Sequence, residues 1–117
     1  MQTILFVLNA PPYGSERILT ALRLASALAA DKTAARLTVF LASDAVVCAH
    51  TGQQVAAGNS LGQMLGDLVA EGVEVFACRT CLDARGMDAG QLLPGVGIGT
   101  MPQLAGLTLA ASKVLSF

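Results

Sequence analysis

The residues best suited to chemistry in this sequence are two cysteines, Cys78 and Cys81, in a C-x-x-C spacing. The apolar run 73–77 predicts a buried strand that ends at Cys78, and a short polar helix is expected to begin beside it. Backbone N–H groups at the start of a helix favour the thiolate, which is the nucleophilic form of cysteine. We therefore interpret Cys78 as the candidate nucleophile, the alternative being an inert cysteine at the end of a core strand. Cys81 is either a resolving thiol or an ordinary helix residue.

Other polar residues are expected near the same edge of the fold, because each follows a predicted strand and ligand sites in open α/β sheets lie outside the carboxyl ends of the strands. Arg79, directly after Cys78, and Arg85, four residues after Cys81, add positive charge beside the cysteines. Candidate substrate-binding residues are Arg79, Arg85, Tyr13, Ser15, Asp44 and Thr100. For Ser15 we favour a role as the N-cap of the first helix.

A zinc site and a phosphate-binding loop are both disfavoured by spacing. Cys48 and His50 could complete a Cys₃His set with the C-x-x-C pair, but residues two apart on a helix face different directions. We therefore expect no metal and interpret His50 as a solvated residue at a helix end. The segment 95–99, G-V-G-I-G, lacks G-x-G-x-x-G spacing and a following Lys-Ser/Thr pair, so it predicts a short strand that lets another backbone approach closely. No cofactor is expected.

The composition describes one apolar domain. The 117 residues are 54% hydrophobic and only 13% charged, which is apolar for a soluble domain and favours a homo-oligomer that buries the surplus surface. A net charge of −1 and 4% aromatic residues argue against nucleic-acid binding. The apolar runs are strand-sized, so no membrane partner is expected. No export signal is evident, and three cysteines then indicate a reducing compartment, the cytoplasm.

Strand-like and helix-like segments alternate along residues 1–117 and predict a single α/β domain: a parallel sheet with helices on both faces, in three α/β/α layers. Ser60 is expected to cap the third helix, and Ser43-Asp44 the short second one. A loop is expected at 51–59. The predicted strands are 3–8, 36–41, 73–77, 95–99 and 113–117, and the helices 16–30, 43–48, 60–71 and 101–111.

Three motifs in this order, N-A-P-P-Y-G-S-E, L-A-S-D-A-V and C-R-T-C-L-D-A-R-G, resemble the DsrE/DsrF-like family, and above all its YchN-type branch. The resemblance covers the whole chain. It implies a five-stranded parallel sheet, a homo-oligomer with a hexamer as the expected size, and kinship with sulfur-relay proteins of the TusD and DsrE kind. Those proteins accept sulfur as a persulfide on a cysteine that precedes an R-G pair by seven residues, which here is Cys78 before Arg85-Gly86. Cys81 belongs to the YchN-like pattern only.

Three functions remain open from the sequence. The first is a cytoplasmic sulfur carrier or sulfurtransferase that holds a persulfide on Cys78 and works with sulfur-donor and sulfur-acceptor proteins. The second is a non-enzymatic oligomer that binds a small anion or a thiol ligand at clefts between subunits. The third is a dithiol oxidoreductase that uses both Cys78 and Cys81. The sequence does not identify the donor, the acceptor or the pathway.

Overall fold

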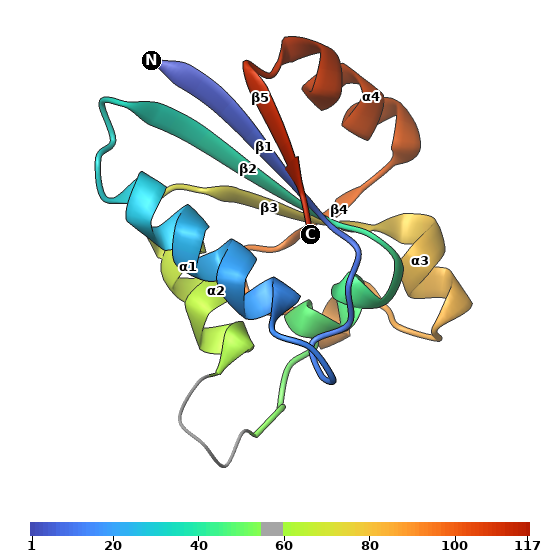
Figure 1. Cartoon of the computed structure of the whole chain (residues 1–117). Helices are drawn as coiled ribbons and strands as arrows, with labels where there is room; N and C mark the ends of the chain where they lie inside the picture. The colour runs from blue at the N-terminus through green and yellow to red at the C-terminus, as the bar shows by residue number, and fades with distance from the viewer. Residues whose placement is uncertain (55–59) are drawn as a thin grey trace.

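The computed structural model describes residues 1–54 and 60–117, so part of the predicted loop 51–59 lies outside the described residues. Strands and helices alternate along the chain as expected (Figure 1). The elements are β1 (Gln2–Leu8), α1 (Arg17–Ala29), β2 (Ala35–Leu41), the 3₁₀ helix η1 (Ser43–Ala49), α2 (Leu61–Ala70), β3 (Glu74–Cys78), α3 (Arg79–Ala84), the 3₁₀ helix η2 (Ala89–Gln91), β4 (Gly97–Gly99), α4 (Met101–Ala110) and β5 (Lys113–Ser116).

The five strands form one sheet in the order β4-β3-β2-β1-β5, and every neighbouring pair is parallel. All the carboxyl ends therefore meet at one edge, where Leu41 pairs with Ala77 and Cys78 with Gly99. The predicted five-stranded parallel α/β fold is confirmed. Because β2 lies between β1 and β3, the loop after β1 is two strands away from Cys78.

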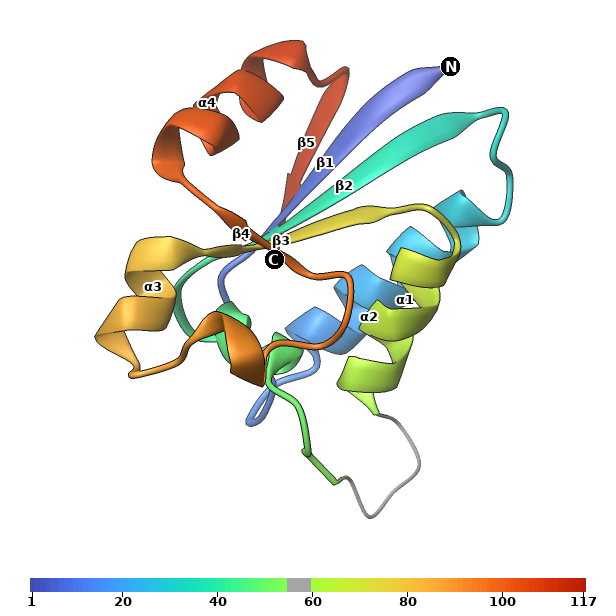
Figure 2. The same cartoon turned by 180° about the vertical axis from the view of Figure 1, so that it is seen from behind.

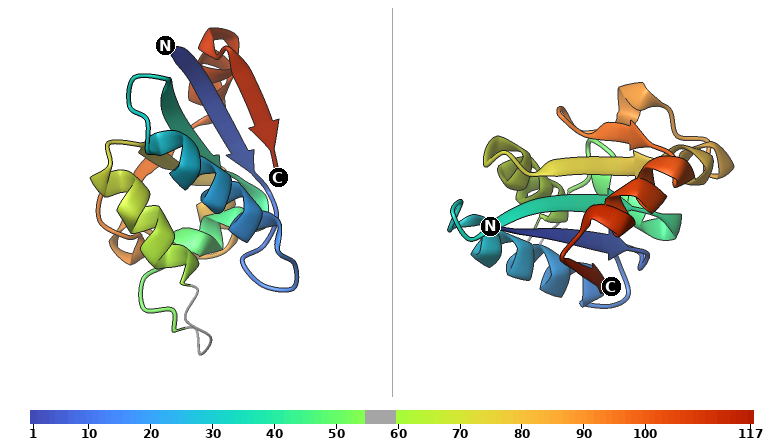
Figure 3. Two further views of the ribbon diagram at one scale, coloured as in Figure 1. Left: turned by 60° about the vertical axis from the view of Figure 1, so that its left-hand side comes forward. Right: turned by 90° about the horizontal axis from the view of Figure 1, so that it is seen from above.

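The sheet is covered unequally on its two faces. Helices α1 and α2 pack against each other on one face, and α4 lies on the other (Figures 1 and 2). Figure 3 shows α3 beyond the carboxyl edge of the sheet rather than on a face. Strands β1 and β2 are the centre of the core, with Phe6 and Phe40 fully buried, as expected for parallel strands covered on both sides. By contrast, α4 has no buried residue.

Two of the predicted helix caps need correction. Ser60 does cap α2, since its Oγ accepts from the Gln63 N–H at 3.1 Å. The N-cap of α1, however, is Glu16 without a side-chain cap, and Ser15 Oγ only accepts a long 3.4 Å bond from the Arg17 N–H. At η1 the N-cap is Ala42 and no side chain caps the helix, so the predicted Ser43-Asp44 cap is wrong.

The glycine-rich segment forms a strand over Gly97–Gly99 only, because Gly95 turns the chain with φ +88°. Its glycines make room for aromatic rings rather than for another backbone, which corrects the sequence-based expectation. A Cβ on Gly99 would lie 2.5 Å from Phe40 Cε2, and a Cβ on Gly97 3.0 Å from Phe76 Cδ1. These two glycines therefore let β4 pair with β3 as the edge strand beside the Phe40 and Phe76 rings.

Candidate active site at the carboxyl end of β3

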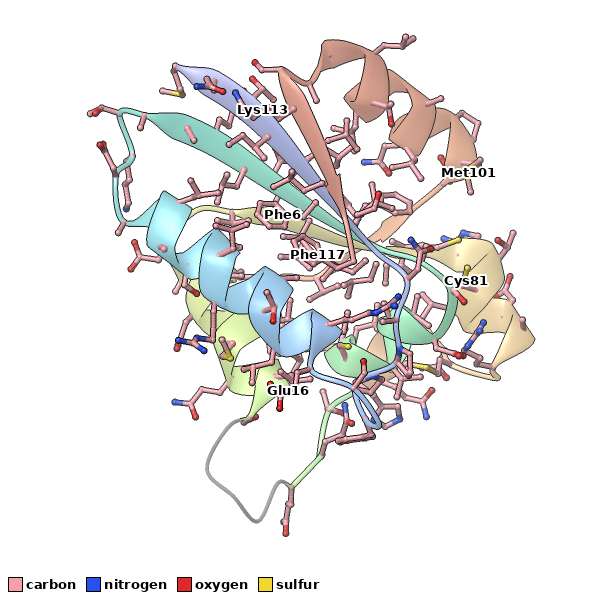
Figure 4. The ribbon with its side chains drawn as sticks, in the orientation of Figure 1. Phe6, Glu16, Cys81, Met101, Lys113 and Phe117 are labelled. Carbon is pink, nitrogen blue, oxygen red and sulfur yellow. The ribbon has the colours of Figure 1, made fainter. Side chains whose placement is uncertain are left out.

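Cys78 is the last residue of β3 and the N-cap of α3. Val75 and Ala77 anchor the strand in the core, and α3 ends before Gly86, which has φ +65°. This short strand–helix corner holds Cys78 at the sheet edge with 2% of its surface exposed. Cys81, one helical turn further on, is partly exposed and lies on α3 beside that edge (Figure 4). A molecule arriving from solvent therefore meets Cys81 before Cys78.

A hydrogen bond reaches the sulfur of Cys78, since the Thr80 hydroxyl lies 3.3 Å from Cys78 Sγ. The Cys81 thiol and the backbone N–H groups of Cys81 and Thr80 act on this thiol in the same direction and lower its pKa. Burial raises the pKa of the Cys78 thiol, but these donors together outweigh burial and hold its pKa below the ordinary value. Hydrogen bonding to the charged form of a group has this effect. Cys78 is therefore the better thiolate of the pair.

At Cys81 the influences that raise the thiol pKa outweigh those that lower it. Burial raises the pKa of the Cys81 thiol, and its hydrogen bond and charge interaction with Cys78 raise it further. The Ser43 backbone N–H, which donates to Cys81 Sγ at 3.1 Å, and the Arg85 guanidinium act in the lowering direction without reversing the shift. Of the two thiols, Cys81 is therefore the weaker acid.

An ion pair joins α3 to η1 next to these sulfur atoms. Arg85 donates from Nη2 and Nε to Asp44 Oδ1, at 2.8 and 3.1 Å, and from Nη1 to the Cys81 carbonyl oxygen at 3.0 Å. Two of the predicted binding residues, Asp44 and Arg85, are therefore assembled with the cysteine pair. The positive charge of Arg85 acts on Cys81 rather than on Cys78.

The other predicted residues lie in different settings. Arg79 is exposed at the start of α3 and makes no hydrogen bond or ion pair within residues 1–54 and 60–117. Thr100 caps α4 in a capping box with Gln103, which gives it a structural role. Tyr13 and Ser15 face a groove beyond β1 and β5 instead of the cysteine pair. Thr80 and Ser43 were not among the predicted binding residues, and Ser43 was expected only as part of a helix cap. The spacing of Thr80, two residues after a cysteine at a helix start, could have revealed its hydroxyl contact.

The groove beyond β1 and β5 has a volume of about 890 Å³. It lies where the strand order reverses, between the first and the last strand of the chain. The Phe117 ring stacks on Phe6 with centroids 5.9 Å apart, and both are labelled in Figure 4. The Tyr13 hydroxyl at its rim donates to Gln53. The lining residues are Asn9, Ala10, Pro11, Tyr13, Gly14, Ser15, Arg17, Ser116 and Phe117.

The third cysteine lies apart from this chemistry. Cys48 is fully buried in η1, and burial raises the pKa of its thiol to about 12. His50, interpreted from the sequence as solvated, is instead half-buried, where it pairs with Leu92 and contacts the Thr51 carbonyl oxygen through Nδ1 at 2.6 Å.

Within the described residues, no three His, Cys, Asp or Glu side chains are grouped to hold a metal ion. The helices of the same residues include none long and apolar enough to cross a bilayer.

Comparisons with known proteins agree with this fold over the whole chain. The Protein YchN of Escherichia coli K12 is 46% identical over 117 residues, covering 100% of both chains. The crystal structure of ychN protein from E. coli has a TM-score of 0.95 and covers all of both chains. An uncharacterised protein of Methanopyrus kandleri is 32% identical over 100% of this chain and 95% of its own. The MTH1491 structure from Methanobacterium thermoautotrophicum, with 21% identity, full coverage of both chains and a TM-score of 0.78, shares the fold. The family model described as DsrE/DsrF-like matches residues 2–117, and this chain belongs to that family.

Proposed function

We propose that this protein accepts sulfur as a persulfide on Cys78. The observation that carries the proposal is the hydrogen-bonded sulfur of Cys78, whose thiol pKa is lowered although burial alone would raise it. The DsrE/DsrF-like family is related to sulfur-relay proteins, which supports the same chemistry. The role of Cys78 in this chain rests on the geometry around its sulfur.

The proposed loading reaction is a nucleophilic substitution at sulfur. The Cys78 thiolate attacks the terminal sulfur of a donor persulfide, the donor's S–S bond breaks, and the donor leaves as a thiolate that takes a proton from solvent. The new Cys78 persulfide is anionic near neutral pH. The Thr80 hydroxyl and the Cys81 thiol are placed to donate hydrogen bonds to it. We propose that the exposed Arg79 and the partly exposed Arg85 favour an anionic donor group; Tyr13, Ser15 and Thr100 have no part in this step.

Intact-protein mass spectrometry after incubation with a persulfide donor tests this proposal. We expect a mass gain of one sulfur atom, mapped to the peptide that contains Cys78. Cys48→Ser serves as the matched control and should load normally, because that thiol is buried and its pKa is about 12. Loading on Cys48 or on no cysteine would contradict the proposal.

A dithiol oxidoreductase is the second candidate, favoured by one observation: the two thiols of the C-x-x-C pair act on each other, lowering the pKa of Cys78 and raising that of Cys81. In that case an external disulfide would oxidise the pair, and the mass would fall by two hydrogen atoms with no gain of sulfur. A chain that shows neither change on treatment with persulfide or disulfide would instead fit a non-enzymatic binding protein.

We further propose that the protein is a homo-oligomer, with a hexamer as the expected size. Large apolar side chains are exposed around α4, at Met101 (59%), Leu109 (88%) and Val114 on β5 (42%). Sedimentation analysis should show a stable assembly at micromolar concentration, because stable interfaces bury about 800 Å² per partner and this face offers apolar surface for one. Sedimentation of the unaltered chain as a monomer would argue against the oligomer. Identical sedimentation of the unaltered chain and the Leu109→Glu variant would argue against this face as the interface.

Three free thiols also suit the reducing cytoplasm, where we place the protein.

A further inference from the structure

Ser43 stands out in the backbone because it adopts φ +52°, the left-handed region that favours glycine. Within residues 1–54 and 60–117, the other residues with positive φ are all glycines. A left-handed serine persists only where its surroundings hold it in place, and such residues gather at functional sites. The Ser43 side chain is exposed and makes no hydrogen bond within residues 1–54 and 60–117, whereas its backbone N–H does make one.

The N–H of Ser43 follows the extended backbone of Ala42 and points at the cysteine pair, and the left-handed φ of Ser43 turns the chain that follows into η1. The preceding Ala42 N–H still bonds the Leu8 carbonyl oxygen at 2.8 Å and so continues the β1–β2 ladder. Ser43 then turns, and its N–H donates to Cys81 Sγ at 3.1 Å across a sequence separation of 38 residues. The Asp44–Arg85 ion pair holds η1 and α3 together at the same place.

We propose that Ser43 is a positioning residue whose backbone N–H stabilises the thiolate of Cys81 in the step that releases sulfur from Cys78. The inference rests on the proposed function of the cysteine pair and adds the group that activates its second member. In the described residues the Ser43 N–H bonds the Cys81 sulfur, whereas the Cys78 sulfur, which is the loading site, is bonded by the Thr80 hydroxyl.

The release step balances without a co-reactant. Cys81 passes its proton to the outer sulfur of the anionic Cys78 persulfide, and the resulting Cys81 thiolate attacks Sγ of Cys78. The bond between the two persulfide sulfurs breaks as the Cys78–Cys81 disulfide forms, and the outer sulfur leaves as hydrosulfide. The two cysteine sulfurs are oxidised and the outer sulfur is reduced. Two equivalents of a small thiol then return the pair to its reduced form.

Other charged groups also act on Cys81, and the test must separate them from Ser43. Cys78 faces it from the end of β3, Arg85 from α3 itself, and Asp44 reaches the same place from η1 through Arg85. Arg79 and Asp83 are exposed on α3. A variant that removes only the Ser43 N–H leaves all of these unchanged.

The test replaces the amide between Ala42 and Ser43 by an ester, which removes the Ser43 N–H and keeps the side chain. The full chain can be assembled by ligation at Cys48. In a Cys78→Ser background, the ultraviolet absorbance of the Cys81 thiolate is titrated; Cys48 stays silent because its thiol pKa is about 12. We expect the ester to raise the Cys81 pKa by about one to two units, as for loss of a hydrogen bond to a charged group.

The matched control is Ser43→Gly, which keeps the N–H and accepts the left-handed φ, and whose Cys81 pKa should equal that of the unaltered chain. In chains with both cysteines, the ester should slow sulfide release at neutral pH roughly three- to tenfold, since a weaker acid forms less thiolate but a more nucleophilic one. Loading of Cys78 should not change. An unshifted Cys81 pKa in the ester chain, or an equal shift in Ser43→Gly, would overturn the role of Ser43.

A measurement on an all-amide chain covers the case in which the ester chain does not fold. In the Cys81→Ala chain the Ser43 amide loses its acceptor, so its proton resonance should move upfield while that of Ala42 stays in place. An unmoved Ser43 resonance would overturn the inference. Because loading at Cys78 is scored separately by mass, failure of the proposed function and failure of this inference give different results.

Discussion

Alkylation rates should separate Cys78 from Cys48 although both are buried. Cys78 is 2% exposed and Cys48 is fully buried, so access differs little and the thiolate fraction decides the rate. The pKa of the Cys48 thiol is about 12, while that of Cys78 lies below the ordinary 9.0. The difference of at least about three units gives Cys78 at least about a thousandfold more thiolate at neutral pH.

Intrinsic nucleophilicity offsets part of this advantage, because a less basic thiolate reacts more slowly. With a Brønsted slope of about 0.5, the expected ratio of labelling rates is about thirtyfold in favour of Cys78. Iodoacetamide labelling of the native chain, quenched over time and mapped by peptide mass spectrometry, measures both rates together. The rate at Cys78 should also level off below pH 9.0, the ordinary value above which an unperturbed thiol ionises.

A matched pair of variants tests the cause of the shift. Cys81→Ser keeps an O–H donor beside the Cys78 sulfur, whereas Cys81→Ala removes the donor, so labelling of Cys78 at neutral pH should fall in the alanine variant and less in the serine variant. Labelling of Cys48 as fast as Cys78, or a Cys78 rate that keeps rising above pH 9.0, would refute the argument that hydrogen bonds outweigh burial at this sulfur.

Two further predictions follow from single contacts. Thr80→Val should raise the Cys78 thiol pKa by about one unit, the value of one hydrogen bond to a charged group, while Thr80→Ser should not; the pH dependence of labelling checks both. Gly99→Ala should lower the free energy of unfolding by about 1–3 kcal/mol, because its Cβ would lie 2.5 Å from the buried Phe40 ring. The matched Gly106→Ala on α4 meets nothing within 4 Å and should raise it by about 0.5–1 kcal/mol, and an equal effect of the two in urea unfolding would contradict the overpacking argument.

The sheet could be predicted from the sequence because its central strands are continuous apolar runs. Phe6 and Phe40 lie in such runs and are fully buried, and parallel strands alternating with helices leave few topologies. The position of Cys78 followed from the same pattern. The helix caps were harder to predict from the sequence. The chain turns at Gly14, with φ +91°, and α1 then begins one residue later than expected, with Glu16 rather than Ser15 at the N-cap position.

The finer parts of the site depend on long-range geometry that no local pattern encodes. The contact from the Ser43 N–H to Cys81 joins residues 38 apart and lies where the backbone becomes left-handed after β2. Tyr13 lies beyond β1 because β2 separates β1 from β3 in the sheet, an order that alternation alone does not give. The direction of the Arg85 charge, toward Cys81 and Asp44, likewise depends on how α3 meets η1.

Sulfane sulfur measured on Cys78→Ser and Cys81→Ser after incubation with a persulfide donor tests the central claim most directly. We predict that Cys78→Ser takes up no sulfur, because neither Cys48 nor Cys81 is both activated and placed at the strand end. Cys81→Ser should load and retain the sulfur longer than the unaltered chain, because the resolving thiol one helical turn away is gone. Normal loading of Cys78→Ser, with or without failure of Cys81→Ser, would contradict the assignment of Cys78 as the sulfur acceptor.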